Sequence, residues 1–547
     1  MRHVQSTSAI EKTTNSNVYD LFVIGGGING TGIALDASGR GLSVALCEQA
    51  DLASATSSAS SKLIHGGLRY LEHYEFRLVR EALAEREVLL STAPHLIKPL
   101  RFILPHRPHL RPAWMIRIGL FMYDHLSSRN KLAGSAGRKL DPAARDNPLS
   151  ESIGRGFEYS DCQVDDARLV VSNALGAQER GARIMVRTRC IGATRENGLW
   201  RIELEELLTG RRFEVFARGL VNAAGPWAQK LVEQQMKTKS PRTVRLIKGS
   251  HFVTRKVYEG DQAYILQNED QRIVFVIPYN RDFTLVGTTD KVYEGDPAQV
   301  AMDAEEEQYL LDVYNRHFKR QLGREDILWR YSGVRPLCDD ESASPSAMTR
   351  DYTLEVGVDE QGELPVLHVF GGKLTTYRRL AEAALHALQP YFPHMTGSWT
   401  RTGTLPGGDI GGDDFGDWLT SLKRQYGWLP DDLAARLGNA YGTRVHALLQ
   451  GCHALADLGK HFGAGLYQRE VEFLLEQEWA RSAEDVLWRR SKLGLRVSAE
   501  DIQALDRFVR EKLAAPLSSP SRVADDQASV MQRGESWIPP THPTHAA

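Results

Sequence analysis

The chain has 547 residues, of which 67 are basic and 69 acidic, so its formal net charge is −2. A chain of this length folds as two or three domains of about 100 to 200 residues each. The balanced charge gives no reason to expect a nucleic acid partner, and any charge argument has to be local. The five cysteines are scattered without Cys-x-x-Cys spacing, so we expect no disulfide framework, no metal site and a reducing, cytosolic compartment.

No apolar run reaches the roughly 18 to 20 residues needed to cross a bilayer, and the N-terminus lacks the apolar core of a signal peptide. We therefore expect a chain that is neither secreted nor threaded through a membrane. Residues 1–17 and 516–547 are polar and unpatterned, and they are expected to be disordered tails because they bury too little apolar surface.

The first elements form a βαβ unit. An apolar strand is expected at residues 19–24, a helix at 30–40 that ends at Gly41, and a second strand at 42–46. Further helices are expected at 75–90 and at 165–180. The second of these begins with carboxylates, which favour a helix start, and stops at Gly181.

The pattern then changes to strands. Residues 183–220 read as a β-meander with turns at 196–198 and 209–210, and further strands are expected at 249–254, 272–278 and 283–288. A helix at 304–318 interrupts this antiparallel substrate sheet. A buried strand at 365–370 and a helix at 374–388 then resume the first domain. After a glycine-rich linker at 406–412, only helical periods follow from 415 to 513.

A glycine-rich turn follows the first strand and precedes the first helix. Gly25, Gly27 and Gly30 satisfy G-x-G-x-x-G around Ile28 and Asn29. The glycines permit a tight turn, a close approach to a pyrophosphate and close helix packing, while the helix N-terminus offers N–H donors and a positive dipole. Glu48 closes the second strand about twenty residues on, where a carboxylate accepts hydrogen bonds from a ribose. The turn predicts an adenine dinucleotide without separating NAD from FAD.

Three later segments favour FAD. The hydroxyl-rich run 56–62 suits a second phosphate and a ribityl chain, and residues 220–225 end a strand in small residues that allow a ligand to approach. Residues 371–376 form a second strand-to-helix turn, whose helix N-terminus can stabilise negative charge on a reduced flavin. We therefore predict a flavin redox enzyme.

Seven segments carry a resemblance to a known family. They are 25–32, 56–71 (TSSASSKLIHGGLRYL), 245–251 (RLIKGSH), 287–290 (GTTD), 331–337 (YSGVRPL), 349–352 (TRDY) and 371–377 (GGKLTTY). In order and spacing the chain resembles the FAD-dependent respiratory (aerobic) sn-glycerol-3-phosphate dehydrogenases of bacteria, from about residue 19 to about 515. The resemblance implies oxidation of the C2 hydroxyl of glycerol 3-phosphate to dihydroxyacetone phosphate. Hydride would pass to FAD and electrons to ubiquinone, in glycerol catabolism and the respiratory chain.

The predicted fold class is α/β plus α: a Rossmann-like FAD-binding domain with an inserted antiparallel β substrate domain and a helical C-terminal domain. The FAD-binding domain is expected in three parts, at 18–90, 161–245 and 346–404. An insertion at 91–160 carries a candidate membrane-contact segment. The substrate sheet is expected at 246–345 and the helical domain at 405–515. The role of that last domain stays open between packing and self-association as a homodimer.

The motifs and the resemblance together name candidate site residues. The cofactor candidates are Gly25, Gly27, Ile28, Asn29, Gly30, Glu48, Thr56, Ser57, Ser61, Lys62, Leu63, His65, Gly67, Gly225, Gly372, Lys373, Leu374 and Thr375. A phosphate dianion requires several cations in one pocket, preferably arginines, whose planar fork meets two oxygens at once. The substrate candidates are Arg69, Tyr70, Arg335, Arg350 and Lys373.

Removal of the hydroxyl proton calls for a base, and histidine is the usual one near neutral pH. His251 is the first candidate, on a substrate-sheet strand that the resemblance turns toward the flavin. His65 is the second, although the resemblance places it against the cofactor. Arg335 is a catalytic candidate of another kind, because a cation can hold the developing alkoxide and make a discrete base less important.

Residues 88–123 contain no Asp or Glu, although average composition puts about four or five there. Basic residues alternate with Trp114 and other large apolar side chains, as an interfacial membrane contact that does not span the bilayer requires. An ordinary buried helix with a solvated basic face explains the pattern equally well. The resemblance favours peripheral contact with the cytoplasmic face of the inner membrane.

Three other functions stay open. A glycerol-3-phosphate oxidase would reoxidise the flavin with dioxygen and require no quinone. A flavoprotein acting on an amine would require one carboxylate-binding arginine, whereas four motif cations suit a phosphate better. A nucleic-acid-binding flavoprotein would use the basic segment 88–123 but leaves those four cations unexplained.

Overall fold

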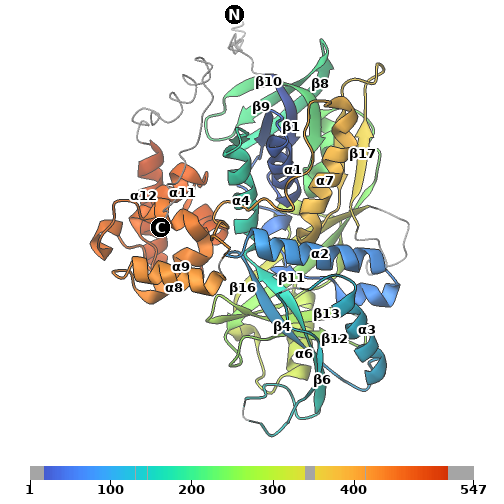
Figure 1. Ribbon diagram of the computed structural model, residues 1–547, viewed down its shortest axis with the longest axis vertical. Coiled ribbons are helices and arrows are strands. Elements are labelled where there is room, and N and C mark those ends of the chain that lie inside the picture. Colours follow the sequence, from blue (N-terminus) through green and yellow to red (C-terminus); the bar gives the residue numbers. More distant parts are fainter. Residues whose placement is uncertain are drawn as a thin grey trace, which may run out of the picture.

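The computed structural model describes residues 18–129, 131–144, 146–270, 272–338, 351–412 and 414–514. The side chains of Arg69 and His73 lie outside this description. The chain builds two sheets and a helical lobe, which confirms the predicted fold class. The lobe, orange to red in Figure 1, lies beside α4.

The first sheet is the nucleotide-binding sheet that the βαβ pattern predicts. Its strand order is β17-β18-β10-β1-β2-β7, and β1, β2, β7, β10 and β18 run parallel. Strands buried on both faces read as continuous apolar runs, as β2 (VALC) does. Its members are β1 Val18–Ile24, β2 Val44–Cys47, β7 Arg183–Met185, β10 Arg212–Asn222, β18 Val366–Phe370 and the antiparallel edge strand β17 Thr353–Gly357.

The predicted meander exists and extends the first sheet. β8 Thr188–Glu196 and β9 Leu199–Glu206 pair antiparallel with each other, and β9 pairs with the first half of β10. The second half of β10 then pairs with β1 and β18. The helices packed against the parallel strands include α1 Ile28–Gly39, α4 Asp166–Gln178 and α7 Tyr377–Leu388. The predicted helix at 374–388 begins with a 3-10 turn, Leu374–Thr376.

The second sheet is larger than predicted. Its path is β15-β11-β14-β13-β12-β4-β6-β3, with β16 beside β11 and β5 beside β6. The strands are β3 Leu63–Ile64, β4 Ile97–Pro105, β5 Ala136–Lys139, β6 Arg155–Val164, β11 Val244–Arg255, β12 Ala263–Gln267, β13 Ile273–Tyr279, β14 Phe283–Gly287, β15 Lys291–Tyr293 and β16 Ile327–Cys338. Helix α6 Ala304–His317 packs against it behind an Asp303–Glu306 capping box.

Residues 91–160 were predicted as an insertion in the FAD-binding domain, and β4 of this segment joins the second sheet through a parallel pairing with β12. Segment 88–123, the predicted membrane contact, is divided among three elements. It comprises the end of α2 Phe76–Thr92, then strand β4, then α3 Ala113–His125. No strand was predicted at β4, because a short run of apolar residues interrupted by Lys98 and Arg101 cannot be told from a buried helix segment by periodicity.

The C-terminal lobe has its own apolar core and is helical, as predicted. It contains α8 Phe415–Gln425, α9 Asp431–Tyr441, α10 Val445–Leu448, α11 Gln468–Gln477 and α12 Ala499–Ala514. A helical turn, Asp485–Arg490, lies between α11 and α12 and contacts α4. The five cysteines are all buried and free.

Candidate active site

The glycine-rich turn leaves no room for side chains at two of its positions. Gly25 has φ +117°, and a Cβ there would lie 2.4 Å from the carbonyl oxygen of Ala223. A Cβ on Gly30 would lie 1.9 Å from the carbonyl oxygen of Gly25. At Gly27, where the dinucleotide pattern requires close approach, the nearest atom to a Cβ would be Ser57 Oγ at 3.1 Å. Gly25 and Gly30 therefore serve chain packing, and Gly27 keeps the start of α1 open.

Glu48 holds the turn from the end of β2. Its Oε2 accepts from the Gly26 N–H at 2.8 Å and its Oε1 from the Ala50 N–H at 2.8 Å. Burial raises the pKa of Glu48, and the two N–H donors oppose that shift. Each carboxylate oxygen retains a second lone pair with which to accept a ribose hydroxyl, so the predicted role is compatible with this geometry.

Loops from distant parts of the chain converge on the same turn. Asn29 Nδ2 donates to the carbonyl oxygen of Gly371 at 3.0 Å, and a Cβ on Gly372 would lie 2.8 Å from that Nδ2. Gly225, with φ +54°, begins a 3-10 turn just beyond Ala223, the residue against which Gly25 packs. Asn29 Oδ1 is buried without a hydrogen-bond partner in the described ranges. A buried acceptor of this kind at the start of α1 fits a bound polar ligand.

The hydroxyl-rich segment 56–62 links this turn to the second sheet. Ser57 Oγ accepts from the Ile28 N–H at 3.0 Å, and Thr56 Oγ1 donates to the Val334 carbonyl at 2.7 Å. The ammonium of Lys62, a cofactor candidate, instead donates to Asp166 Oδ2 at 2.8 Å inside the protein. The main chain of Lys62 is also engaged within the protein, because its N–H donates to Ser60 Oγ and its carbonyl accepts from the Val164 N–H.

The remaining cofactor candidates lie near the 3-10 turn before α7. The His65 N–H donates to Thr375 Oγ1 at 3.2 Å, and Leu374 and Thr375 belong to that turn. Leu63 lies in β3, opposite Gln163 of β6. Gly67 has φ +73° and begins the helical turn Leu68–His73. Four loops therefore meet at the carboxyl ends of β1, β10 and β18, where ligands bind in open α/β sheets. They are the glycine-rich turn 25–30, the segment 56–67, the loop at Gly225 and the turn at 371–376.

His251 lies on β11, next to the cofactor loops. Its Nε2 and Ser61 Oγ are 2.8 Å apart, and its ring stacks on Tyr331 at 4.8 Å with an interplanar angle of 10°. Burial, aided by the positive charges of Lys62 and Arg335, lowers the pKa of His251 well below 6.5. The imidazole is therefore neutral at neutral pH. Its Nδ1 is buried without a partner in the described part of the chain.

Arg335 lies one strand away on β16, opposite Ile247. Its Nη1 donates to Asp290 Oδ1 at 2.5 Å and its Nη2 to the Thr289 carbonyl at 3.2 Å, and the side chain is 29% exposed. The carbonyl oxygen of Pro336 is 3.6 Å from where a Cβ on Gly371 would lie, so β16 abuts the turn that carries Lys373.

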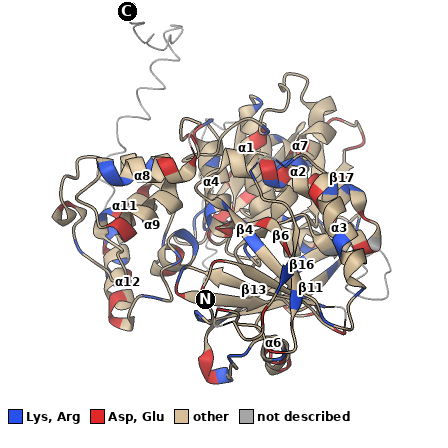
Figure 2. Ribbon diagram, turned by 60° about the horizontal axis from the view of Figure 1, so that its bottom comes forward, with Lys and Arg blue, Asp and Glu red and all other residues tan. Residues whose placement is uncertain are grey.

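Lys373 and Arg335 are the two predicted substrate-binding cations whose side chains the structure describes. The ammonium of Lys373 lies 4.2 Å from the centre of the Tyr70 ring, a cation–π contact. Arg350 and the side chain of Arg69 lie outside the described residues. In Figure 2 the blue of Lys and Arg marks β11, β16 and α3.

Sequence reasoning missed three residues near His251. Tyr331 donates its hydroxyl to the Ser60 carbonyl at 2.7 Å besides stacking on the histidine. Asp166 accepts from Ser60 Oγ and from two lysines, Lys62 and Lys492. The carboxylate was noticed only as a helix start, and Lys492 belongs to the helical lobe, where no local pattern indicates its role.

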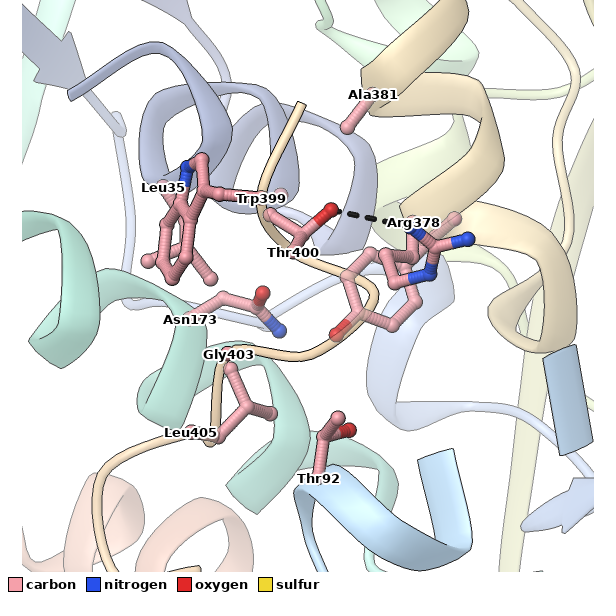
Figure 3. Close-up of a pocket in the computed structure, with 11 residues that line it drawn as sticks. Leu35, Thr92, Asn173, Arg378, Ala381, Trp399, Thr400, Gly403 and Leu405 are labelled. Carbon is pink, nitrogen blue, oxygen red and sulfur yellow. Dashed lines mark hydrogen bonds between the residues drawn. The ribbon is translucent and has the colours of Figure 1, made fainter. Parts of the chain in front are cut away.

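The small cavity in Figure 3 is not this site. It lies between α1, α4, α7 and the segment 399–405, and its lining includes Leu35, Asn173 and Trp399. Its volume of about 10 Å³ is close to what one water molecule requires. It is therefore a packing void behind α1.

These residues fit FAD: glycines that open the start of α1, a carboxylate after β2 and an Asn29 oxygen that has no partner among the residues the structure describes. A family model described as FAD dependent oxidoreductase matches residues 20–378, and one described as C-terminal domain of alpha-glycerophosphate oxidase matches residues 398–515. The fold and site define a flavin-dependent oxidoreductase.

Sequence comparison with individual proteins identifies a narrower branch of this class to which the chain is similar. The chain is 59% identical over 498 residues to a glycerol-3-phosphate dehydrogenase of Pseudomonas aeruginosa, covering 91% of this chain and 96% of the relative. It is 56% identical to the aerobic glycerol-3-phosphate dehydrogenase of Escherichia coli, covering 91% and 99%. It is 50% identical to a D-erythritol 1-phosphate dehydrogenase of Brucella abortus, again covering 91% and 99%.

A solved structure agrees with this placement. The glycerol-3-phosphate dehydrogenase of Bacillus halodurans, complexed with FAD, superposes with a TM-score of 0.72 at 26% identity and covers 94% of this chain and 95% of its own. The chain belongs to the FAD-dependent oxidoreductases and, within them, to the glycerol-3-phosphate dehydrogenase family.

Proposed function

We propose that the chain oxidises sn-glycerol 3-phosphate to dihydroxyacetone phosphate with FAD and passes the electrons to ubiquinone in a membrane. The observation that carries the proposal is the neutral, buried His251 one strand away from Arg335, beside the FAD loops. FAD, held by the glycine-rich turn and Glu48, would supply the hydride acceptor for C2 of the substrate.

His251 takes the hydroxyl proton in this proposal. Ser61 lies at Nε2, so a neutral ring whose Nε2–H donates to Ser61 presents an unprotonated Nδ1. That nitrogen is the atom that receives the proton. Stacking on Tyr331 and the buried setting fix the ring orientation, which a general base requires.

Arg335 and Lys373 bind the phosphate. Arg335 is oriented by Asp290, and its partial exposure leaves the guanidinium accessible to a ligand. Arg69 and Arg350 are proposed to complete the cation set. In the alternative role, Arg335 stabilises the developing alkoxide, and a discrete base then matters less.

The electron acceptor separates two activities. A dehydrogenase reduces a soluble ubiquinone analogue without oxygen, whereas an oxidase produces hydrogen peroxide in air. We expect quinone-dependent turnover of glycerol 3-phosphate under anaerobic conditions and little peroxide. Stoichiometric peroxide with indifference to quinone would replace the dehydrogenase by the oxidase.

A second substrate is favoured by one specific observation. The Brucella relative named for D-erythritol 1-phosphate is 50% identical over the same span as the glycerol-3-phosphate relatives. Both compounds are phosphate monoesters of polyols, so the phosphate cations serve either one. Measurement of kcat/KM with each compound decides which one is the preferred substrate, and we expect the larger value for glycerol 3-phosphate.

The membrane contact is proposed at the outer face of α3. Trp114, Ile118 and Phe121 are 63%, 51% and 57% exposed, and their spacing places them on one side of the helix, while Leu120 and Tyr123 face inward. No helix of the described residues is long and apolar enough to cross a bilayer. An outward apolar stripe of this kind suits insertion into the headgroup region.

Charge favours an anionic lipid surface as the occupant. Arg111 and Arg117 are exposed beside the stripe, and the chain has no acid from residue 88 to 123. Inside the protein, the hydroxyl of Tyr123 accepts from the Gly66 N–H at 2.9 Å, next to His65 in the cofactor loops. A helix bound to the surface therefore lies close to the site that a quinone has to approach. This supports a peripheral location at the cytoplasmic face of the inner membrane.

Vesicle co-sedimentation tests this surface. The double variant Trp114→Ser, Phe121→Ser should lose most binding to vesicles with anionic phospholipid, because each aromatic contributes about 1.5 to 3 kcal/mol on burial. Leu208→Ser is the matched control, since Leu208 is 62% exposed in the turn between β9 and β10. Equal loss in both variants, or a change in oligomeric state without lipid, would contradict the lipid contact.

A further inference from the structure

The helical lobe contacts the rest of the protein at several places, among them the buried pair of Glu478 with Arg168 and the short segment 485–492. Arg490 pairs with Asp51 through two contacts of 2.8 Å, and Arg489 Nε contacts Asp51 at 2.6 Å. Asp51 lies in the loop after β2, just beyond Glu48 and Ala50. These buried ion pairs fix the segment against the FAD-binding part of the chain.

One path from this segment reaches His251 through hydrogen bonds. Lys492 Nζ contacts Asp166 Oδ1 at 2.9 Å, while Asp166 Oδ2 accepts from Ser60 Oγ at 2.8 Å and from Lys62 Nζ at 2.8 Å. Ser60 and Lys62 flank Ser61, whose hydroxyl contacts His251. Asp166 therefore fixes the chain on both sides of the group that orients the histidine.

A second path consists of stacked rings. Trp488 and Trp329 lie 4.4 Å apart, Trp329 and Tyr331 4.8 Å, and Tyr331 and His251 4.8 Å. Aromatic pairs at these separations pack favourably, and each ring restricts the next. Tyr331 also donates to the Ser60 carbonyl, so the two paths join at Ser60.

We propose that Lys492 and Trp488 of the helical lobe are positioning residues for His251. The inference rests on the proposed role of His251 as the base, and it gives the lobe a function in the reaction. Neither residue is among the predicted substrate- or cofactor-binding residues. Each limits how far the imidazole ring and Ser61 can move, and a displacement of about 1 Å at a reacting group costs up to about 100-fold in rate.

Steady-state kinetics of the FAD-loaded, full-length enzyme with glycerol 3-phosphate test the proposal. Lys492→Met should lower kcat roughly 10- to 100-fold, with KM and flavin content within about twofold of wild type. Lys512→Met is the matched control, because Lys512 pairs with Glu472 within the same lobe at 2.6 Å, away from the site. That control should keep wild-type kcat.

A double-mutant cycle with His251→Asn separates positioning from general stability. If Lys492 acts through the histidine, Lys492→Met should cost less than about threefold in the His251→Asn background. Trp488→Leu should behave in the same way, and Trp488→Phe, which keeps a ring, should recover most of the lost kcat. The tryptophan variants also serve if Lys492→Met does not fold.

The outcomes separate the positioning role of Lys492 and Trp488 from the assignment of His251 as the base. Full additivity with His251→Asn, or a loss of flavin that accounts for the lost kcat, would overturn the positioning role. Wild-type kcat in both Lys492→Met and Trp488→Leu would also overturn it while leaving the proposed function intact. Wild-type activity of His251→Asn itself would instead refute the base assignment.

Discussion

Arg335 offers the sharpest test of the phosphate site. The substitution Arg335→Ala removes a guanidinium that is 29% exposed and is held by Asp290. A hydrogen bond to a charged group contributes about 1.5 to 3 kcal/mol, and every 1.4 kcal/mol is tenfold in affinity. Since partial exposure screens the charge, we expect a loss toward the lower end, about 10- to 50-fold in kcat/KM for glycerol 3-phosphate.

The assay compares glycerol 3-phosphate with glycerol, which lacks the phosphate. Arg335→Ala should affect glycerol turnover little, and Arg335→Lys should recover only part of the loss because a lysine lacks the planar fork. The matched control is Arg330→Ala on the same strand, whose guanidinium pairs with Glu307 of α6. Equal losses with both substrates, or no loss with glycerol 3-phosphate, would refute the phosphate assignment.

Three further predictions concern the cofactor turn and two histidines. Gly30→Ala should yield protein without flavin, measured as flavin absorbance per mole of protein, because its Cβ would lie 1.9 Å from the Gly25 carbonyl; a full flavin complement would contradict the packing. Burial lowers the pKa of His95 to about 3, so only the unfolded chain gains a proton on this residue between pH 6.5 and 3. The free energy of unfolding therefore decreases as the pH is lowered. His95→Phe should therefore reduce the loss of unfolding free energy between pH 7 and pH 5 by about 2 kcal/mol in denaturant titrations, and an unchanged loss would refute this. Because the pKa of His251 is depressed, kcat/KM should begin to fall only below pH 6.5. Lys62→Met removes a nearby positive charge, so it should move this acidic fall in kcat/KM to higher pH. An unchanged pH profile would contradict a contribution of Lys62 to the depressed pKa.

Local sequence was sufficient for the cofactor turn. The spacing of Gly25, Gly27 and Gly30 between a strand and a helix, with Glu48 at the next strand end, depends on contacts within about thirty residues. The structure brings Glu48 to the Gly25 turn. The loops at Gly225 and Gly372 were also predicted as cofactor loops, because a strand that ends in small residues is a local signal, and they lie beside the same turn.

Sequence periodicity could not find the extent of the second sheet. Strand β4 pairs with β12, more than 150 residues further along the chain, and no local pattern encodes such a partner. For the same reason the side chains around His251 could not be predicted, since Asp166 pairs with Lys62 across 104 residues and with Lys492 across 326. The missing acids of segment 88–123 were visible, but which side of α3 faces solvent was decided by packing.

The central claim is that this chain carries out FAD-dependent oxidation of glycerol 3-phosphate. The most direct measurement mixes the purified FAD-loaded enzyme with glycerol 3-phosphate in the absence of oxygen and follows the visible absorbance of the flavin. We expect rapid bleaching with glycerol 3-phosphate, recovery on addition of a quinone analogue, and far slower bleaching with glycerol. Flavin that stays oxidised with glycerol 3-phosphate would contradict the proposed function.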